Sequence, residues 1–117
     1  MDMNAMIQKI RSNPQSDRMG MIASHLGIVR ENSLKGGRVA GIEVAFDQQK
    51  ITEIIQDTIS LDGIIDVLVE VCEGRLNIGD VIMAVAVGGD IRERVFPALI
   101  ETVNRIKSEA STKREIF

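Results

Sequence analysis

The sequence has no tryptophan and no tyrosine, and its three phenylalanines bring the aromatic content to only 3% of 117 residues. Base-stacking surfaces for single-stranded nucleic acid depend on such rings, so this class of function is disfavoured. A single cysteine, Cys72, excludes an internal disulfide framework and is typical of a reducing compartment. His25 is the only histidine, which leaves no second one for a His-rich metal site.

The chain also lacks a strong charge, a long apolar run and an apolar leader. Its formal net charge of −3 gives no general attraction to nucleic acid or membranes, so any anion site must be local. The uncharged run at residues 81–89 is far too short to span a bilayer, and the N-terminus carries Asp2 and no signal-peptide core. We therefore expect a cytoplasmic protein that binds neither nucleic acid nor membrane.

What is present is the composition of a globular domain, with 44% hydrophobic and 26% charged residues. A chain of this length typically forms one domain with a modest core. We assign residues 1–20 to an N-terminal arm, in which residues 3–12 form a short helix that Pro14 ends. The arm could dock on the domain or on a partner. Residues 21–117 form the single domain.

Hydrophobic periodicity in the domain predicts the order strand–strand–helix, twice over. The predicted strands are residues 21–30, 38–46, 64–72 and 81–89, and the predicted helices are residues 47–60 and 90–107. A glycine-containing link of hairpin type, residues 31–37, joins the first two strands. The fold class is therefore α+β, with a mainly antiparallel sheet packed with helices. Exposed strand edges in so small a domain also favour a homodimer.

Polar residues mark the starts of the two domain helices. Asp47 is predicted to cap the first helix. Asp90 and Glu93 resemble a capping box at the start of the second. Pro97 lies inside the second helix and should kink it or delay its regular part, because proline has no backbone N–H.

The junction of strand, glycines and helix at Gly88 and Gly89 is a candidate anion site. Free N–H groups and the positive end of a helix dipole favour anions there, and Arg92 could add a bidentate grip. Arg30 ends a strand just before a loop, where side chains often face ligands. The plainer alternatives are a tight turn for the glycines and a solvated surface cation for Arg30.

For the other candidate residues, the sequence pattern alone favours a structural or solvated side chain over a functional one. Lys107 and Lys113 flank a segment without apolar periodicity and fit solvated lysines. His25 fits a strand histidine that is satisfied by a local hydrogen bond. Cys72 has no nearby cysteine partner and is interpreted as structural. No metal site is predicted.

Three segments, in this order, resemble the motifs of one family. They are HLGIVRENSLKGGRVAGIEVAF (25–46), EGRLNIGDVIMAVAVGGDIRERVF (73–96) and IKSEASTKREIF (106–117). The first contains a Gly-x-Val-Arg strand, the second a Gly-Arg-Leu-x-x-Gly-Asp segment before an apolar strand, and the third a Lys-Arg-Glu ending. Their order and spacing resemble the large, catalytic subunit of molybdopterin synthase (MoaE-like), from about Met21 to Phe117.

The resemblance implies an activity and its partners. A homodimer would bind a small ubiquitin-like sulfur-carrier subunit that ends in a Gly-Gly thiocarboxylate, forming a heterotetramer. Sulfur would pass from this thiocarboxylate to cyclic pyranopterin monophosphate and form the dithiolene of molybdopterin, in molybdenum cofactor biosynthesis. The resemblance implies no metal and no cofactor for this step.

The resemblance also implies roles for five cations. Lys107 and Lys113 correspond to active-site lysines. Arg30 and Arg92 correspond to arginines of the pocket for the anionic substrate, and Arg114, which continues the Lys113 motif, is assigned to substrate binding with them. Guanidinium groups suit a phosphate-bearing pterin, and ammonium groups can hold a thiocarboxylate or a developing oxyanion.

Two further hypotheses remain. Ile91 stands where the family has a histidine, and Ala110-Ser111-Thr112 replace its Pro-x-Trp. The spacing between the two lysines is also one residue shorter. These departures favour a second reading, a catalytically impaired homodimer that binds the small subunit or a pterin without turnover. The third hypothesis is a dimeric α+β sensor that binds an anion at Gly88-Gly89-Asp90.

Overall fold

Two antiparallel sheets make up the β structure of the computed structural model, which describes residues 2–117. The strand order is β1-β5-β3 in the first sheet and β4-β2-β6 in the second. The strands are β1 (Met21–Ile28), β2 (Gly41–Phe46), β3 (Ile64–Val71), β4 (Gly74–Asn77), β5 (Val81–Gly89) and β6 (Ser111–Ile116). The helices are α1 (Met3–Arg11), α2 (Gln48–Ile59) and α3 (Arg92–Arg105), with a 3-10 turn η1 (Ser16–Arg18) and a π turn η2 (Ile106–Ala110). None of these helices is long and apolar enough to cross a membrane.

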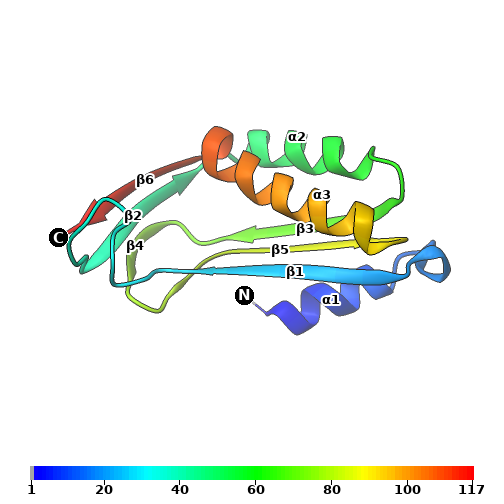
Figure 1. Ribbon diagram of the computed structural model, residues 1–117, viewed down its shortest axis with the longest axis horizontal. Coiled ribbons are helices and arrows are strands. Elements are labelled where there is room, and N and C mark those ends of the chain that lie inside the picture. Colours follow the sequence, from blue (N-terminus) through cyan, green and yellow to red (C-terminus); the bar gives the residue numbers. More distant parts are fainter. Residues whose placement is uncertain (1) are drawn as a thin grey trace.

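The molecule is elongated, with extents of 47 × 25 × 24 Å, and the second sheet forms one of its ends (Figure 1). α2 and α3 cover one face of the first sheet, and α1 lies against the opposite face (Figure 1). The central strand β5 is therefore buried on both faces, which explains its uninterrupted apolar sequence.

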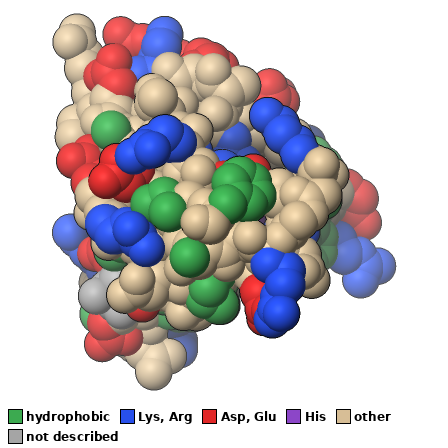
Figure 2. Space-filling model, turned by 90° about the vertical axis from the view of Figure 1, so that its left-hand side faces the viewer, with side chains coloured by type: hydrophobic (Ala, Val, Ile, Leu, Met, Phe, Trp, Pro, Cys, Tyr) green, Lys and Arg blue, Asp and Glu red, His purple; other side chains and the backbone are tan. Residues whose placement is uncertain are grey.

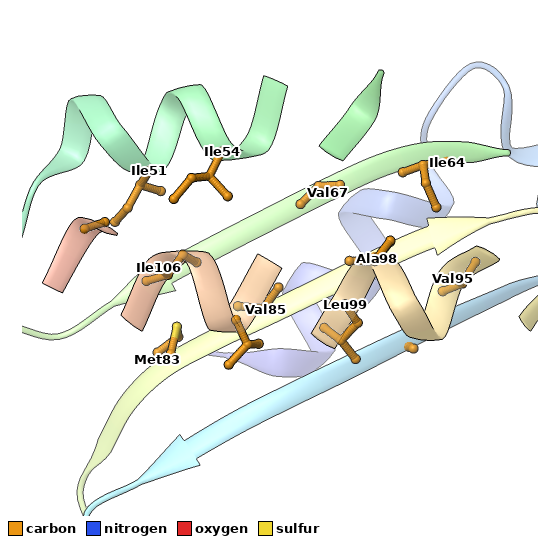
Figure 3. Close-up of a cluster of buried hydrophobic side chains, with 14 residues drawn as sticks. Ile51, Ile54, Ile64, Val67, Met83, Val85, Val95, Ala98, Leu99 and Ile106 are labelled. Carbon is orange, nitrogen blue, oxygen red and sulfur yellow. The ribbon is translucent and has the colours of Figure 1, made fainter. Parts of the chain in front are cut away.

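The main core lies between the first sheet and the helices α2 and α3. Figure 3 shows Ile51 and Ile54 of α2 and Leu99 of α3 in one cluster with Val67 and Val85 of the sheet. These side chains are between 0% and 9% exposed. Their helical residues recur at the spacing of one helix face, so the same pattern that predicts α2 and α3 also places them on the sheet.

The N-terminal arm packs on the domain. Asp2 caps α1 by accepting a hydrogen bond from the backbone N–H of Ala5 at 3.2 Å. Met6 and Ile10 then bury against Ala84 and Ala86 of β5. These alanines are small enough to let a helix approach the strand closely, so α1 closes the second face of the first sheet.

The antiparallel α+β arrangement is confirmed, but the strands divide between two sheets. β1 pairs with β5 and β2 pairs with β4 and β6, so the first two strands of the chain do not pair with each other. The link between them makes a small hairpin of its own, with a bridge between Asn32 and Arg38. β4 and β6 are strands that periodicity did not predict, because both are short and largely polar.

The two helix starts differ from each other. Asp47 caps α2 as predicted, accepting from the backbone N–H of Lys50 at 3.1 Å. The capping box predicted for α3 is wrong, because the helix begins at Arg92 and the carboxylate of Asp90 lies too early in the chain. Asp90 instead accepts from the backbone N–H of Ile91 at 2.7 Å and from the Arg94 guanidinium at 2.8 Å. α3 starts before Pro97 and runs through it, so its regular part is not delayed.

Candidate functional site

Lys107 lies in the π turn η2, which redirects the chain from α3 into β6. Ile106 and Ala110 anchor this turn in the main core. On its outer side, Arg105 donates to Glu109 at 2.8 Å and to Asp57 of α2 at 2.8 Å. The turn is therefore held from both sides, and the exposed Lys107 projects from a fixed backbone.

Lys113 lies in β6, and its register fixes the side of the sheet that it occupies. Lys113 is opposite Val44 of β2, whereas Arg114 is opposite Glu43. Directly opposite residues in an antiparallel pair share a face, and successive residues alternate. Lys113 thus lies on the face of the buried Val44, and Arg114 lies on the other face, where it donates to Glu43 at 2.9 Å.

Arg30 follows the end of β1, where the chain leads on toward the second sheet. The residue before it, Val29, packs in the same cluster as Val44. Arg30, Lys107 and Lys113 are exposed, and none of them makes an ion pair within residues 2–117. Three cations without carboxylate partners are thus available to bind anionic groups.

Figure 2 shows the end of the molecule that the second sheet forms, with Lys and Arg side chains spread around exposed hydrophobic ones. Leu34, which is 87% exposed, lies in the loop before β2, and Phe117, which is 73% exposed, follows β6. Phe117 also lies against Gly37 of that loop, so the C-terminus and the loop lie together. The surface at this end of the molecule therefore combines basic and hydrophobic side chains.

Arg92 is not near the other cations. It is the first residue of α3, and Lys107 follows the end of the same helix, so about 22 Å separates them at a rise of about 1.5 Å per residue. Its guanidinium lies 3.4 Å from the carboxylate of the adjacent Glu93. Arg92 therefore lies at the opposite end of the molecule from β6 (Figure 1).

At the predicted anion site beside Gly88 and Gly89, backbone groups are already hydrogen-bonded within the protein. The backbone N–H of Asp90 donates to the carbonyl of Gly63 at 2.9 Å, and the carbonyl of Gly89 accepts from Gly20 at 2.8 Å. A Cβ atom at Gly89 would lie 2.6 Å from the Gly63 carbonyl oxygen. Close packing thus accounts for the glycine here, and the backbone N–H group of Asp90 is not free to bind an anion. Among residues 2–117, no group of three or more His, Cys, Asp or Glu side chains could hold a metal ion.

His25 differs from its prediction. Its Nε2 atom is buried and has no hydrogen-bond partner within residues 2–117, so the expected local hydrogen bond is not formed. Burial lowers the pKa of His25 below its ordinary value of 6.5, and the nearby Lys107 ammonium lowers it further. The neighbourhood of His25 and Lys107 is a feature that sequence reasoning missed, since it depends on how η2 packs on the sheet.

The fold and its unpaired cations define an α+β protein with two antiparallel sheets and a surface suited to anionic groups. The profile of the MoaE protein family matches residues 1–109, and the chain belongs to this family. Its role is therefore in molybdenum cofactor biosynthesis. The match ends before Lys113, so the assignment of Lys113 depends on the terminal motif alone.

Solved structures with this fold come from several bacteria. A molybdopterin cofactor biosynthesis protein E from Burkholderia multivorans is 24% identical, with 99% of this chain and 84% of that chain covered and a TM-score of 0.79. Molybdopterin synthase from Staphylococcus aureus is 23% identical, with 86% and 77% covered and a TM-score of 0.74. A complex of subunits 1 and 2 of molybdopterin-converting factor from Helicobacter pylori is 14% identical, with 100% and 84% covered and a TM-score of 0.72. No curated protein sequence matches the chain significantly.

Proposed function

We propose that this protein is the catalytic subunit of a molybdopterin synthase. It transfers sulfur from the thiocarboxylate of a small ubiquitin-like subunit to cyclic pyranopterin monophosphate and forms the dithiolene of molybdopterin. The observation that carries the proposal is that Arg30, Lys107 and Lys113, in a chain of the MoaE family, make no ion pair within residues 2–117. The reaction takes place in the cytoplasm and needs no metal.

The arginine and the two lysines have different roles in this proposal because their charged groups differ. Arg30 presents a planar guanidinium, which suits the phosphate of the pterin substrate. Lys107 and Lys113 present ammonium groups that attract the thiocarboxylate and stabilise the oxyanion that develops when its carbonyl carbon is attacked. Lys113 extends from a paired strand and Lys107 from an anchored turn, so both groups start from fixed backbone positions.

The partner is a small subunit with a Gly-Gly terminus. The Helicobacter pylori structure, which shares this fold, is described as a complex of two subunits of molybdopterin-converting factor. The mixed apolar and basic end in Figure 2 supports a protein partner on that side, because exposed Leu34 and Phe117 would lose contact with water on binding.

A homodimer would explain how Arg92, which lies far from Lys113 within one chain, can contribute to the same site. One chain cannot bring Arg92 to Lys113, because α3 separates Arg92 from η2 and β6. A site that uses all the predicted cations except the outward-facing Arg114 must therefore take Arg92 from a second copy of the chain.

The test is reconstitution of the reaction. The purified protein is mixed with the thiocarboxylated small subunit and cyclic pyranopterin monophosphate, and molybdopterin is measured as its fluorescent oxidation product. We expect formation of molybdopterin by the wild type and a loss of about 100-fold or more with Lys113→Ala, as is typical when a charge-stabilising group is removed. The control is Lys9→Ala, an exposed lysine of α1 outside the site, which should keep full activity.

The second candidate is a non-catalytic homodimer that binds the small subunit or a pterin. Ile91 favours it, because this side chain stands at the family's histidine position and cannot donate or accept a proton. Binding of the thiocarboxylated small subunit with no molybdopterin formed would support this candidate and contradict the enzymatic one.

A further inference from the structure

His25 lies on the face of β1 that the helices cover. It is opposite Val85 of β5, and Val85 is fully buried in the core under α2 and α3. Directly opposite residues share a face, so the imidazole is directed toward the helix side of the first sheet. β1 is an edge strand of this sheet, and His25 is therefore half-buried at the rim of the core and not at its centre.

The π turn η2 lies above this part of the sheet. Figure 3 shows Ile106 over Met83 and Val85. The β1 partners of these two residues are Gly27 and His25. Lys107, the next residue of the turn, is thereby brought to the side of the sheet where His25 lies, and its charge acts on the imidazole.

Gly27 makes room for the ring. A Cβ atom at Gly27 would lie 3.3 Å from Nε2 of His25, so the imidazole lies against the backbone of its own strand. On the neighbouring strand β5, the residues opposite His25 and Gly27 are the apolar Val85 and Met83. Nε2 consequently has no partner among the described residues and no contact with water, which is an unfavourable state for a buried polar atom.

The surroundings of His25 determine the protonation state of its imidazole. Burial and the Lys107 ammonium both oppose protonation, so His25 is neutral at pH 7. A neutral imidazole carries one N–H and one lone pair. Placing the proton on Nδ1 leaves a lone pair on Nε2 and avoids a buried, unpaired N–H group. With the proton assigned to Nδ1, Nε2 is a hydrogen-bond acceptor that has no donor within residues 2–117.

We propose that His25 is a positioning residue of the sulfur-transfer site, in which its Nε2 accepts a hydrogen bond from the Lys107 ammonium once substrate and small subunit are bound. The proposal rests on the proposed function. The ammonium group has three N–H donors. One of them points to His25, which holds the group in place, and the others remain for the thiocarboxylate and the oxyanion. No proton is transferred in this arrangement.

Three substitutions separate hydrogen bonding from packing. His25→Phe keeps a ring of similar volume and removes the acceptor, and we expect kcat to fall about tenfold or more, with KM for the small subunit unchanged. His25→Gln extends an amide oxygen about as far as Nε2, so its kcat should stay within about threefold of the wild type. Ser24→Ala, on the same strand but the opposite face, is the control.

The activities of the His25 variants either support or contradict the proposal. Full activity of folded His25→Phe would overturn it. If this variant does not fold, His25→Gln is compared with His25→Asn, whose shorter amide reaches only the Nδ1 position. The proposal requires greater activity for the glutamine variant, and equal activity would contradict it.

A second measurement does not depend on turnover. The pKa of His25 is followed by NMR in the wild type, in Lys107→Met and, as a matched control, in Lys113→Met. We expect a higher pKa in Lys107→Met, because the ammonium that opposes protonation is gone. An unchanged pKa would show that the two side chains are not neighbours and would overturn the proposal. A raised pKa in a protein that forms no molybdopterin would instead reject the proposed function and leave the proximity of the two side chains standing.

Discussion

Lys113 and Arg114 are adjacent in the sequence, yet they lie on opposite faces of the second sheet. The resemblance of the terminal motif implied a catalytic role for Lys113 and substrate binding for Arg114. The alternation of side chains along a strand allows only one of them to face the cluster that contains Val29 and Val44. Arg114 is instead paired with Glu43, in an exposed contact of a kind that contributes about 0–1 kcal/mol to stability.

Arg114→Ala should therefore have little effect. We expect activity within about threefold of the wild type, in contrast to the large loss expected for Lys113→Ala, because a screened surface ion pair contributes little. The measurement is molybdopterin formation at equal concentrations of folded protein. A loss as large as that of Lys113→Ala would mean that Arg114 turns toward the site when the small subunit binds.

At the scale of elements, η2 and β6 determine where the lysines lie. η2 joins α3 to a strand that would otherwise be an unstructured tail, and β6 completes the second sheet by pairing with β2 from Phe46 to Gly41. The turn is tied to the helices through Arg105, which contacts both Glu109 and Asp57. Because Lys107 and Glu109 belong to the same turn, the ion pair at Arg105 also bears on the position of Lys107.

This ion pair predicts a pH dependence. The hydrogen bond from Arg105 lowers the pKa of Glu109 below its ordinary value of 4.5, against a smaller opposing effect of burial. A carboxyl group whose pKa is lower in the folded state stabilises the fold above the unfolded pKa and loses this contribution as the pH falls through the folded pKa. Glu109→Gln should lower Tm at pH 7 and have progressively less effect below about pH 4.5.

The measurement is Tm by circular dichroism between pH 3 and pH 7, with the range chosen around the carboxyl pKa values. Glu101→Gln is the matched control, since Glu101 is an exposed glutamate of α3 without an ion pair in residues 2–117. A Tm difference for Glu109→Gln that stays constant over this range would contradict the prediction.

At the scale of the whole molecule, the predicted cations lie at two ends. Arg92 begins α3 at one end, and Lys113 lies in β6 at the other (Figure 1). A shared site in a homodimer would bring Arg92 of one copy to Lys113 of the second copy. This arrangement can be tested without a structure of the dimer, because two defective chains should restore each other's activity.

Lys113→Ala and Arg92→Ala chains are mixed after co-refolding, and activity is compared with that of each variant alone. In a shared site, each mixed dimer has one intact site and one doubly altered site, so a random mixture should recover roughly a quarter of wild-type activity. If every site lies within one chain, the mixture should show no more activity than the average of the two variants. The masses of the species, from light scattering, show whether dimers formed.

Much of the fold is present in local sequence patterns. The burial of one face of each element produces the alternation in β1 and β3 and the helical spacing in α2 and α3, and burial of both faces produces the apolar run of β5. These patterns involve only residues close together in the sequence, so they can be recognised without the structure. Asp47 is a further example, because an N-cap involves only residues within one turn. The identity of Arg30, Lys107 and Lys113 as candidates also came from short motifs.

The division of strands between two sheets, the strand character of β6 and the exposed edge of the sheet beside His25 depend on contacts between distant residues. The segment Ser111–Ile116 is mostly polar, and it is a strand because β2 offers it a free edge to pair with. That pairing decides that Lys113 and Arg114 face opposite ways. The sequence by itself therefore determined which elements form and which residues carry charge, since both are local properties. Only the tertiary structure decided that Lys107 lies near His25 and that Arg92 lies at the far end, because these depend on packing between segments far apart in the chain.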